Sequence, residues 1–263
     1  MPAAQLSRLQ AQIQSIATQF GHPKVFVRNL LHLMEMYSDR NIQTSTYTKT
    51  EIFIPSYRLP EVVIQQIESQ LINLVELHPT TSLEVIDSLW QKAYFEPRYF
   101  AAVMIGNLPA DFTDFTLSHL ENWVNPKEEK RIVQAVLKIS SQQIRHQAFH
   151  KWIILIRSWL NHPGEEYQQI GLRAIKISID DPQIEEIPLF YELIEPIILN
   201  VSLALQKDLL QTFSSLAHQF PKESIAFLKS ILEKTESAMV RRFIRRCLPF
   251  FDDELQNTLS RQL

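Results

Sequence analysis

Apolar residues recur at helical spacing along almost all of this 263-residue chain. In one stretch they fall three or four residues apart, at Val63, Ile67, Leu71 and Leu74. This spacing places them on one face of an α-helix, and a face of this kind packs against another element. The expected helices cover residues 5–20, 24–38, 60–77, 82–92, 97–107, 112–124, 127–140, 143–160, 165–179, 187–199, 201–219, 222–234, 237–250 and 252–262.

The segments between these helices are short, and their composition favours an all-α fold. The chain has only 4 glycines, whereas folds rich in strands and turns need many. Residues 39–59 form the one longer connection, and their Thr, Ser and Tyr content fits an irregular loop or a short strand. Prolines stand where helices would start or stop, at Pro60, Pro109, Pro126, Pro163, Pro182 and Pro221.

From Ser82 onward the helices group into pairs that start near residues 82, 112, 143, 184 and 222. A period of roughly 30–40 residues is typical of HEAT or armadillo repeats, which stack into a solenoid with a concave face. A globular helix bundle is the alternative. We expect one HEAT-like domain over residues 1–263, with an atypical cap and loop at 1–60, paired helices at 61–250 and a C-terminal helix at 251–263.

Charge and composition narrow the class of protein. The net charge of −3 means that any contact with nucleic acid must come from a local patch. No apolar run approaches the about 20 residues that span a bilayer, and no signal-peptide pattern opens the chain. A cytoplasmic protein without a membrane partner is expected. The single Cys247 excludes an internal disulfide and a cysteine-built zinc site, and its apolar surroundings predict a buried thiol.

One stretch resembles a known family. Leu89-Trp90, Phe95-Glu96-Pro97-Arg98 and Phe100-Ala101-Ala102 are similar to the second-repeat signature of the AlkD-type DNA alkylation repair proteins. The resemblance implies a HEAT-like solenoid that holds duplex DNA in its concavity, and active members of the family excise positively charged alkylated bases. It extends over about residues 50–250 through Ile54-Pro55, Leu59-Pro60-Glu61, Trp159-Leu160-Asn161-His162-Pro163, Tyr167-Gln168-Gln169, Leu205-Gln206-Lys207, Phe220-Pro221 and Met239 to Leu248.

The catalytic residues of that family do not carry over. The resemblance implies a cage of two tryptophans and an aspartate around a cationic base. The family's Trp-Trp-Asp-x-x-Asp stretch falls near Glu128–Gln134, which lacks both residue types, although a gap could bring Glu128 or Glu129 closer. Its arginine, second tryptophan and further arginine fall near Ile170, Gln211 and Ser214. We therefore assign no catalytic residue.

A basic patch is the best candidate for a binding site. Four arginines of the predicted helix 237–250 span an arc of about 140°, opposite apolar residues, and could hold consecutive phosphates. Two cations on helix 165–179 would add to a phosphate track if that helix lines the concave face, and one on helix 201–219 could extend it. The alternative is ordinary surface charge paired to nearby acids such as Asp252, Asp253 and Glu254. The candidate residues are Arg173, Lys176, Lys207, Arg241, Arg242, Arg245 and Arg246.

Other conspicuous residues favour structural roles. Glu96 suits the positive end of a helix, Pro97 its first position, and Arg98 a pair with a neighbouring helix. His146 and His150 share one face of the predicted helix 143–160 but lack a third ligand, so no metal site is assigned. No motif for a cofactor is present. Core positions are expected for Trp90, Trp123, Trp152 and Trp159.

Three functions remain open from the sequence. The first is a noncatalytic or divergent relative of the repair enzymes that binds DNA through backbone phosphates on the concave face, with a preference for bent or branched forms. The second is a scaffold that binds a protein or peptide partner. The third is a DNA glycosylase with a rebuilt active site that uses Glu128 or Glu129.

Overall fold

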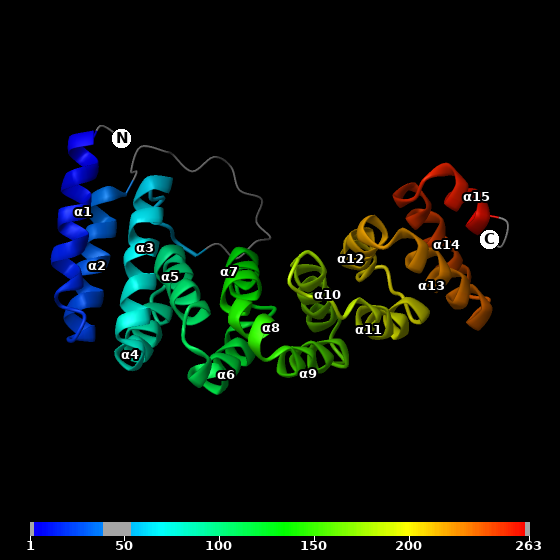
Figure 1. The fold of residues 1–263 in the computed structure, drawn as a ribbon, viewed down its shortest axis with the longest axis horizontal. Helices are drawn as coiled ribbons and strands as arrows, with labels where there is room; N and C mark the ends of the chain where they lie inside the picture. Colours follow the sequence, from blue (N-terminus) through cyan, green and yellow to red (C-terminus); the bar gives the residue numbers. More distant parts are fainter. Residues whose placement is uncertain (1–2, 39–53, 261–263) are drawn as a thin grey trace. The chain divides into compact units, whose positions relative to one another are not determined.

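The computed structural model describes residues 3–38 and 54–260, and its regular elements there are all helical, as Figure 1 shows. The expected all-α class is confirmed, and the stacked helices are of the HEAT-like kind. The chain divides into two compact units, residues 1–147 and 148–263. Whether one domain spans 1–263 stays a prediction.

The first unit is built from two sets of stacked helices. The helix α1 packs on α3, α3 on α5, and α2 on α4, while α5 also packs on the π-helical segment η2. Stacking of this kind buries the apolar face that each helix presents. The elements are α1 (Ala3–Ala17), α2 (Pro23–Tyr37), α3 (Glu61–Leu77), α4 (Pro79–Trp90), α5 (Phe95–Gly106), η1 (Ala110–Phe112), α6 (Thr113–Trp123), α7 (Lys130–Ala135), η2 (Val136–Ser140) and α8 (Gln142–Gln147).

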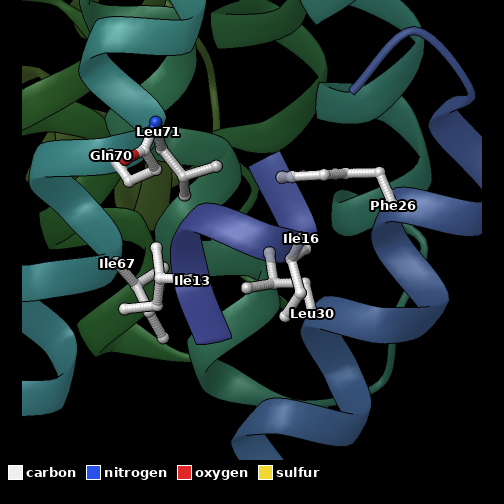
Figure 2. Close-up of a pocket in the computed structure, with 7 residues that line it drawn as sticks. All are labelled: Ile13, Ile16, Phe26, Leu30, Ile67, Gln70 and Leu71. Atoms are coloured by element: carbon white, nitrogen blue, oxygen red, sulfur yellow. The ribbon is translucent and has the colours of Figure 1, made fainter. Parts of the chain in front are cut away.

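The seam between α1, α2 and α3 is closely packed. Figure 2 shows side chains from all three helices converging there, and the gap left between them is about 10 Å³. A gap of this size holds about one water molecule, so the seam is core and not a ligand site. The residues that line it are Ile13, Ile16, Phe26, Leu30, Ile67, Gln70 and Leu71.

The second unit repeats the same arrangement. Its helices α10, α12 and α14 pack on one another in that order, while α9 packs on α11 and α11 on α13 (Figure 1). Two consecutive helices of the chain therefore belong to different layers, one formed by α9, α11 and α13 and the other by α10, α12 and α14. The elements are α9 (Phe149–Leu160), α10 (Glu165–Ile179), α11 (Ile187–Leu199), α12 (Gln206–Gln219), α13 (Pro221–Lys234), α14 (Ala238–Cys247), η3 (Leu248–Phe250) and α15 (Asp253–Ser260).

Three of the four tryptophans and the cysteine lie in the core, as expected. Trp123, Trp152 and Trp159 are buried, and the Trp152 Nε1 donates to Ser178 Oγ at 2.8 Å. Trp90 is half-buried and stacks on Trp123 with ring centroids 3.9 Å apart. Cys247 is fully buried, and that burial raises the pKa of its thiol. An inert thiol follows, because the thiolate is the reactive form.

The expected single helix 143–160 is wrong. The helix α8 ends at Gln147 and α9 starts at Phe149, because Ala148 leaves the helical conformation at φ −138° and ψ 45°. The Ala148 carbonyl accepts the Lys151 and Trp152 N–H groups, which starts a new helix. His146 and His150 therefore lie on different helices. The described residues contain no group of three His, Cys, Asp or Glu that could hold a metal.

Other boundaries move by a few residues. The expected helix 127–140 starts at Lys130 and becomes π-helical at Val136, and the helix expected from residue 201 starts at Gln206. For residues 39–59 the sequence predicts a loop or a short strand. Residues 39–53 of that stretch lie outside the described part of the chain. Residues 54–59 are irregular and carry no strand. Apolar spacing does not report such ends, because caps and turns decide them.

Candidate nucleic-acid interface

The seven candidate cations lie on three helices that contact one another in order. The helix α10 carries Arg173 and Lys176, α12 carries Lys207, and α14 carries the four arginines. Since α10 packs on α12 and α12 on α14, residues far apart in the sequence are brought to one series of helices (Figure 1). We call the outer surface of these three helices the α10–α12–α14 face.

The first turn of α12 links its two neighbours. Asp208 accepts hydrogen bonds from Arg173 of α10, at 2.7 Å from Nε and 3.3 Å from an Nη atom. Gln206 Oε1 accepts a hydrogen bond from an Nη atom of Arg246 on α14, at 2.6 Å. Asp208 and Gln206 are both buried. One turn of helix therefore holds an arginine on each side.

Lys207 stands between these two contacts. Successive residues of an α-helix are rotated by about 100°, so Gln206 and Asp208 flank Lys207 on opposite sides. The buried side of α12 is formed by Leu209, Phe213 and Leu216, and Lys207 is exposed. Its ammonium therefore projects from the face between the arginines of α10 and α14.

The helix α14 has the two faces expected from its sequence. Its buried side is Val240, Phe243, Ile244 and Cys247. Arg242, Arg245 and Arg246 are exposed. Arg241 is half-buried and pairs with Glu236, which precedes the helix, at 2.5 Å. The arginine side of α14 thus faces solvent.

The seven cations differ in how far acids offset their charge. Arg173 is paired with Asp208, Arg241 with Glu236, and Lys176 with Asp180 one turn along α10. These three cations therefore fit, in part, the alternative that the candidates are ordinary surface charges paired with nearby acids. Arg246 is bonded to a neutral amide and keeps its full charge. The exposed cations Lys207, Arg242 and Arg246 are therefore the best placed to meet phosphates.

Glu96 has a role that the sequence did not reveal. Its carboxylate is buried and accepts hydrogen bonds from Ser56 Oγ at 2.7 Å and from the N–H groups of Tyr57 at 2.9 Å and Arg58 at 2.7 Å. It thus holds the segment before α3, where Arg58 has a positive φ of 54°. Glu96 also lies in the first turn of α5, as expected, where a carboxylate suits the positive end of the helix.

The helix α5 starts two residues earlier than the sequence suggested. Phe95 is its first residue, so Pro97 lies third and not first. A proline is still tolerated there, because the first N–H groups of a helix have no partner within it. The expectation for the position of Pro97 is corrected accordingly.

The pair expected for Arg98 is present. Its guanidinium donates to Glu128 at 2.6 Å and to the Lys92 carbonyl at 3.0 Å, and it lies over the Trp90 ring at 5.4 Å. Glu128 precedes α7, so this contact joins the start of α5 to the segment that leads into α7. Glu128 is thereby held by a structural arginine.

Glu129 is also engaged. It is 5% exposed, pairs with Arg131, and accepts the Ile54 N–H at 3.3 Å. The Arg131 guanidinium in turn lies over the Phe95 ring at 4.6 Å. Both carboxylates considered for a rebuilt active site therefore hold neighbouring segments together.

A comparison with protein families identifies the chain's relatives. A family model described as DNA alkylation repair enzyme matches residues 55–245, which is more than half of the chain. The chain belongs to the DNA alkylation repair enzyme family. Neither a search of curated proteins nor one of solved structures gave a match.

The matched range covers much of the geometry described above. In this DNA alkylation repair family member, the match begins at Pro55, beside the segment that Glu96 holds, and ends at Arg245 on α14. It includes every candidate cation except Arg246. No helix in the described ranges is both long and apolar enough to cross a membrane.

Proposed function

We propose that this member of the DNA alkylation repair family binds duplex DNA through backbone phosphates on the α10–α12–α14 face and does not excise bases. The observation that carries the proposal is the first turn of α12. It joins Arg173 of α10 to Arg246 of α14 and projects Lys207 between them. Cations from three helices that pack side by side thus share one surface.

The chemistry of these groups suits phosphates. A guanidinium offers several N–H donors in a planar fork, and an ammonium offers three, so both bind anionic oxygens well. Arg242 and Arg246 lie one turn apart on the exposed side of α14. Because the whole chain carries a net charge of −3, attraction to DNA depends on this local surface.

The contacts of the two candidate carboxylates support a noncatalytic role. Glu128 is bound by Arg98, and Glu129 is buried against Arg131 and the Ile54 N–H. A general base or a stabilising carboxylate must reach the reacting base. Here both groups are occupied by other segments of the protein.

Fluorescence anisotropy with a labelled duplex tests the binding. Affinity should fall steeply between about 50 and 200 mM salt, because bound phosphates release counterions. Arg242→Ala combined with Arg246→Ala should weaken binding at least about tenfold and lower the salt slope by roughly two. The matched control is Lys222→Ala with Lys229→Ala on α13, which removes the same charge and should change little.

Two outcomes would overturn the binding proposal. One is no duplex binding by the folded protein at low salt, and the other is an equal loss in the α13 control. Stoichiometric capture of a protein partner together with absent DNA binding would favour the scaffold function instead.

A glycosylase assay tests the noncatalytic part. DNA treated with a methylating agent is incubated with the protein, and the released bases are measured. We expect no release above the uncatalysed level. Release that Glu128→Gln or Glu129→Gln abolishes would establish an active enzyme and would contradict this part of the proposal.

A further inference from the structure

A second group of cations lies in the first unit, on helices that do not contribute to the α10–α12–α14 face. A groove of about 230 Å³ opens between α2 and the end of α4. The helix α2 lies entirely before residues 55–245, which the family model matches, so family membership assigns no function to this side of the groove. The lining residues are Lys24, Val27, Arg28 and Leu31 on the α2 side and Ser88 and Lys92 on the α4 side.

Helical spacing makes the lining a single surface. Lys24 and Arg28 are four residues apart on α2, so their side chains lie on the same side of that helix. Ser88 is in the last turn of α4, and Lys92 follows in the turn after it. Val27 is buried beneath them and provides an apolar floor.

Among the described residues, no acid is paired with the three cations of the groove. None of the six lining residues is acidic. Within the described ranges, the side chains of Lys24, Arg28 and Lys92 form no ion pair, and the nearby Asp87 carboxylate is bonded to His119 at 2.9 Å. Three cations around one groove repel each other, and a bound anion would relieve that repulsion.

We propose that this groove binds the phosphate group of a small phosphate monoester. Two ammonium groups, a guanidinium and the Ser88 hydroxyl supply the donors that a dianionic phosphate accepts. The apolar floor suits a short carbon skeleton beside the phosphate. The volume is below the roughly 300–1,000 Å³ of sites for larger ligands. A duplex needs an open track of cations rather than a small groove, so the geometry favours the small ligand.

Isothermal titration calorimetry with inorganic phosphate and with glycerol 3-phosphate tests the proposal, and glycerol serves as the uncharged control. We expect saturable binding of both phosphates with a Kd on the order of 1 mM or tighter, and none of glycerol. Arg28→Ala should weaken binding at least about tenfold, since it removes a charge-assisted contact. Ser88→Ala should weaken it a few-fold, and Lys222→Ala on α13 should leave it unchanged.

The outcomes separate this proposal from the function proposed above. Absence of saturable binding by the wild type, or equal affinity in folded Arg28→Ala, overturns it. Circular dichroism and thermal unfolding establish that the variants are folded. In NMR spectra, changes of backbone amide chemical shifts on addition of phosphate that are confined to α2 and the end of α4 would support the location of the site. If Arg28→Ala instead weakens duplex binding as the double substitution Arg242→Ala with Arg246→Ala is expected to do, the groove belongs to a DNA track and the small-ligand proposal is wrong.

Discussion

Arg173 on α10 donates two hydrogen bonds to the carboxylate of Asp208 on α12, from Nε at 2.7 Å and from an Nη atom at 3.3 Å. Asp208 is largely buried, whereas Arg173 is partly exposed on the proposed DNA-binding face. The same contact therefore joins two helices and neutralises a cation that could otherwise meet phosphate. Stability and DNA affinity should respond to it in opposite directions.

Asp208→Asn tests that opposition. It should lower the free energy of unfolding by about 1–3 kcal/mol, because Arg173 loses its charged partner. It should also tighten duplex binding several-fold, because the Arg173 charge is no longer offset. Urea denaturation and fluorescence anisotropy measure the two effects. Asp180→Asn breaks the surface pair with Lys176 and should cost less than about 1 kcal/mol. Weaker DNA binding by folded Asp208→Asn would contradict the prediction.

Glu96→Ala should destabilise the first unit by about 2–4 kcal/mol. The substitution leaves Ser56 Oγ and the N–H groups of Tyr57 and Arg58 without their acceptor, and each such loss is costly where groups are partly buried. Chemical denaturation checks the value. The control is Glu84→Ala on the exposed side of α4, which should stay within about 0.5 kcal/mol of the wild type. Equal effects of the two variants would show that the Glu96 contacts contribute little.

Gly106→Ala should lower stability by at least about 1–3 kcal/mol. A Cβ at residue 106 would lie 2.4 Å from the carbonyl oxygen of Ile139, and this neighbour is backbone, so α5 and η2 would have to separate. Gly21→Ala is the matched control, since a Cβ there meets nothing within 4 Å. The thermal midpoints of the two variants give the comparison. An unchanged midpoint for Gly106→Ala would mean that η2 shifts at no cost.

Tyr99 should make stability sensitive to alkaline pH. Burial, and then its hydrogen bond to Glu68, raise the pKa of the Tyr99 hydroxyl well above its usual value. The neutral form is thus favoured by folding, and this contribution is present below the unfolded pKa of about 10 and is lost as pH rises beyond it. Tyr99→Phe should therefore lose less stability between about pH 8 and 10.5.

Denaturation of both proteins at the two pH values measures that difference. Some loss will remain in Tyr99→Phe, because burial also raises the pKa values of Tyr57, Tyr191 and Cys247. The quantity to compare is the change in the free energy of unfolding between the two pH values and not its absolute value, since the variant lacks the hydrogen bond to Glu68 at every pH. Identical losses in the two proteins would rule out a contribution from Tyr99.

Much of the local structure was predictable from the sequence. Helix α10 spans residues 165–179 and α11 spans 187–199, as the apolar spacing predicts. The two faces of α14 and the burial of Cys247 follow from the same spacing, because the period of 3.6 residues assigns each side chain to one side of its own helix. The ordered motifs around Trp90 and Glu96 likewise indicated the family before any coordinates.

Which sides meet was decided only by the tertiary structure. Arg173 and Asp208 are 35 residues apart, Gln206 and Arg246 are 40 apart, and Glu96 reaches back to residues 56–58. The groove between α2 and α4 joins residues 24–31 to residues 88–92. Apolar spacing describes each helix alone, whereas these contacts depend on how helices stack and on how far each side chain reaches. The sequence therefore predicts which charged residues lie on a helix surface, but it does not predict the acid, amide or backbone group with which each of them forms a contact.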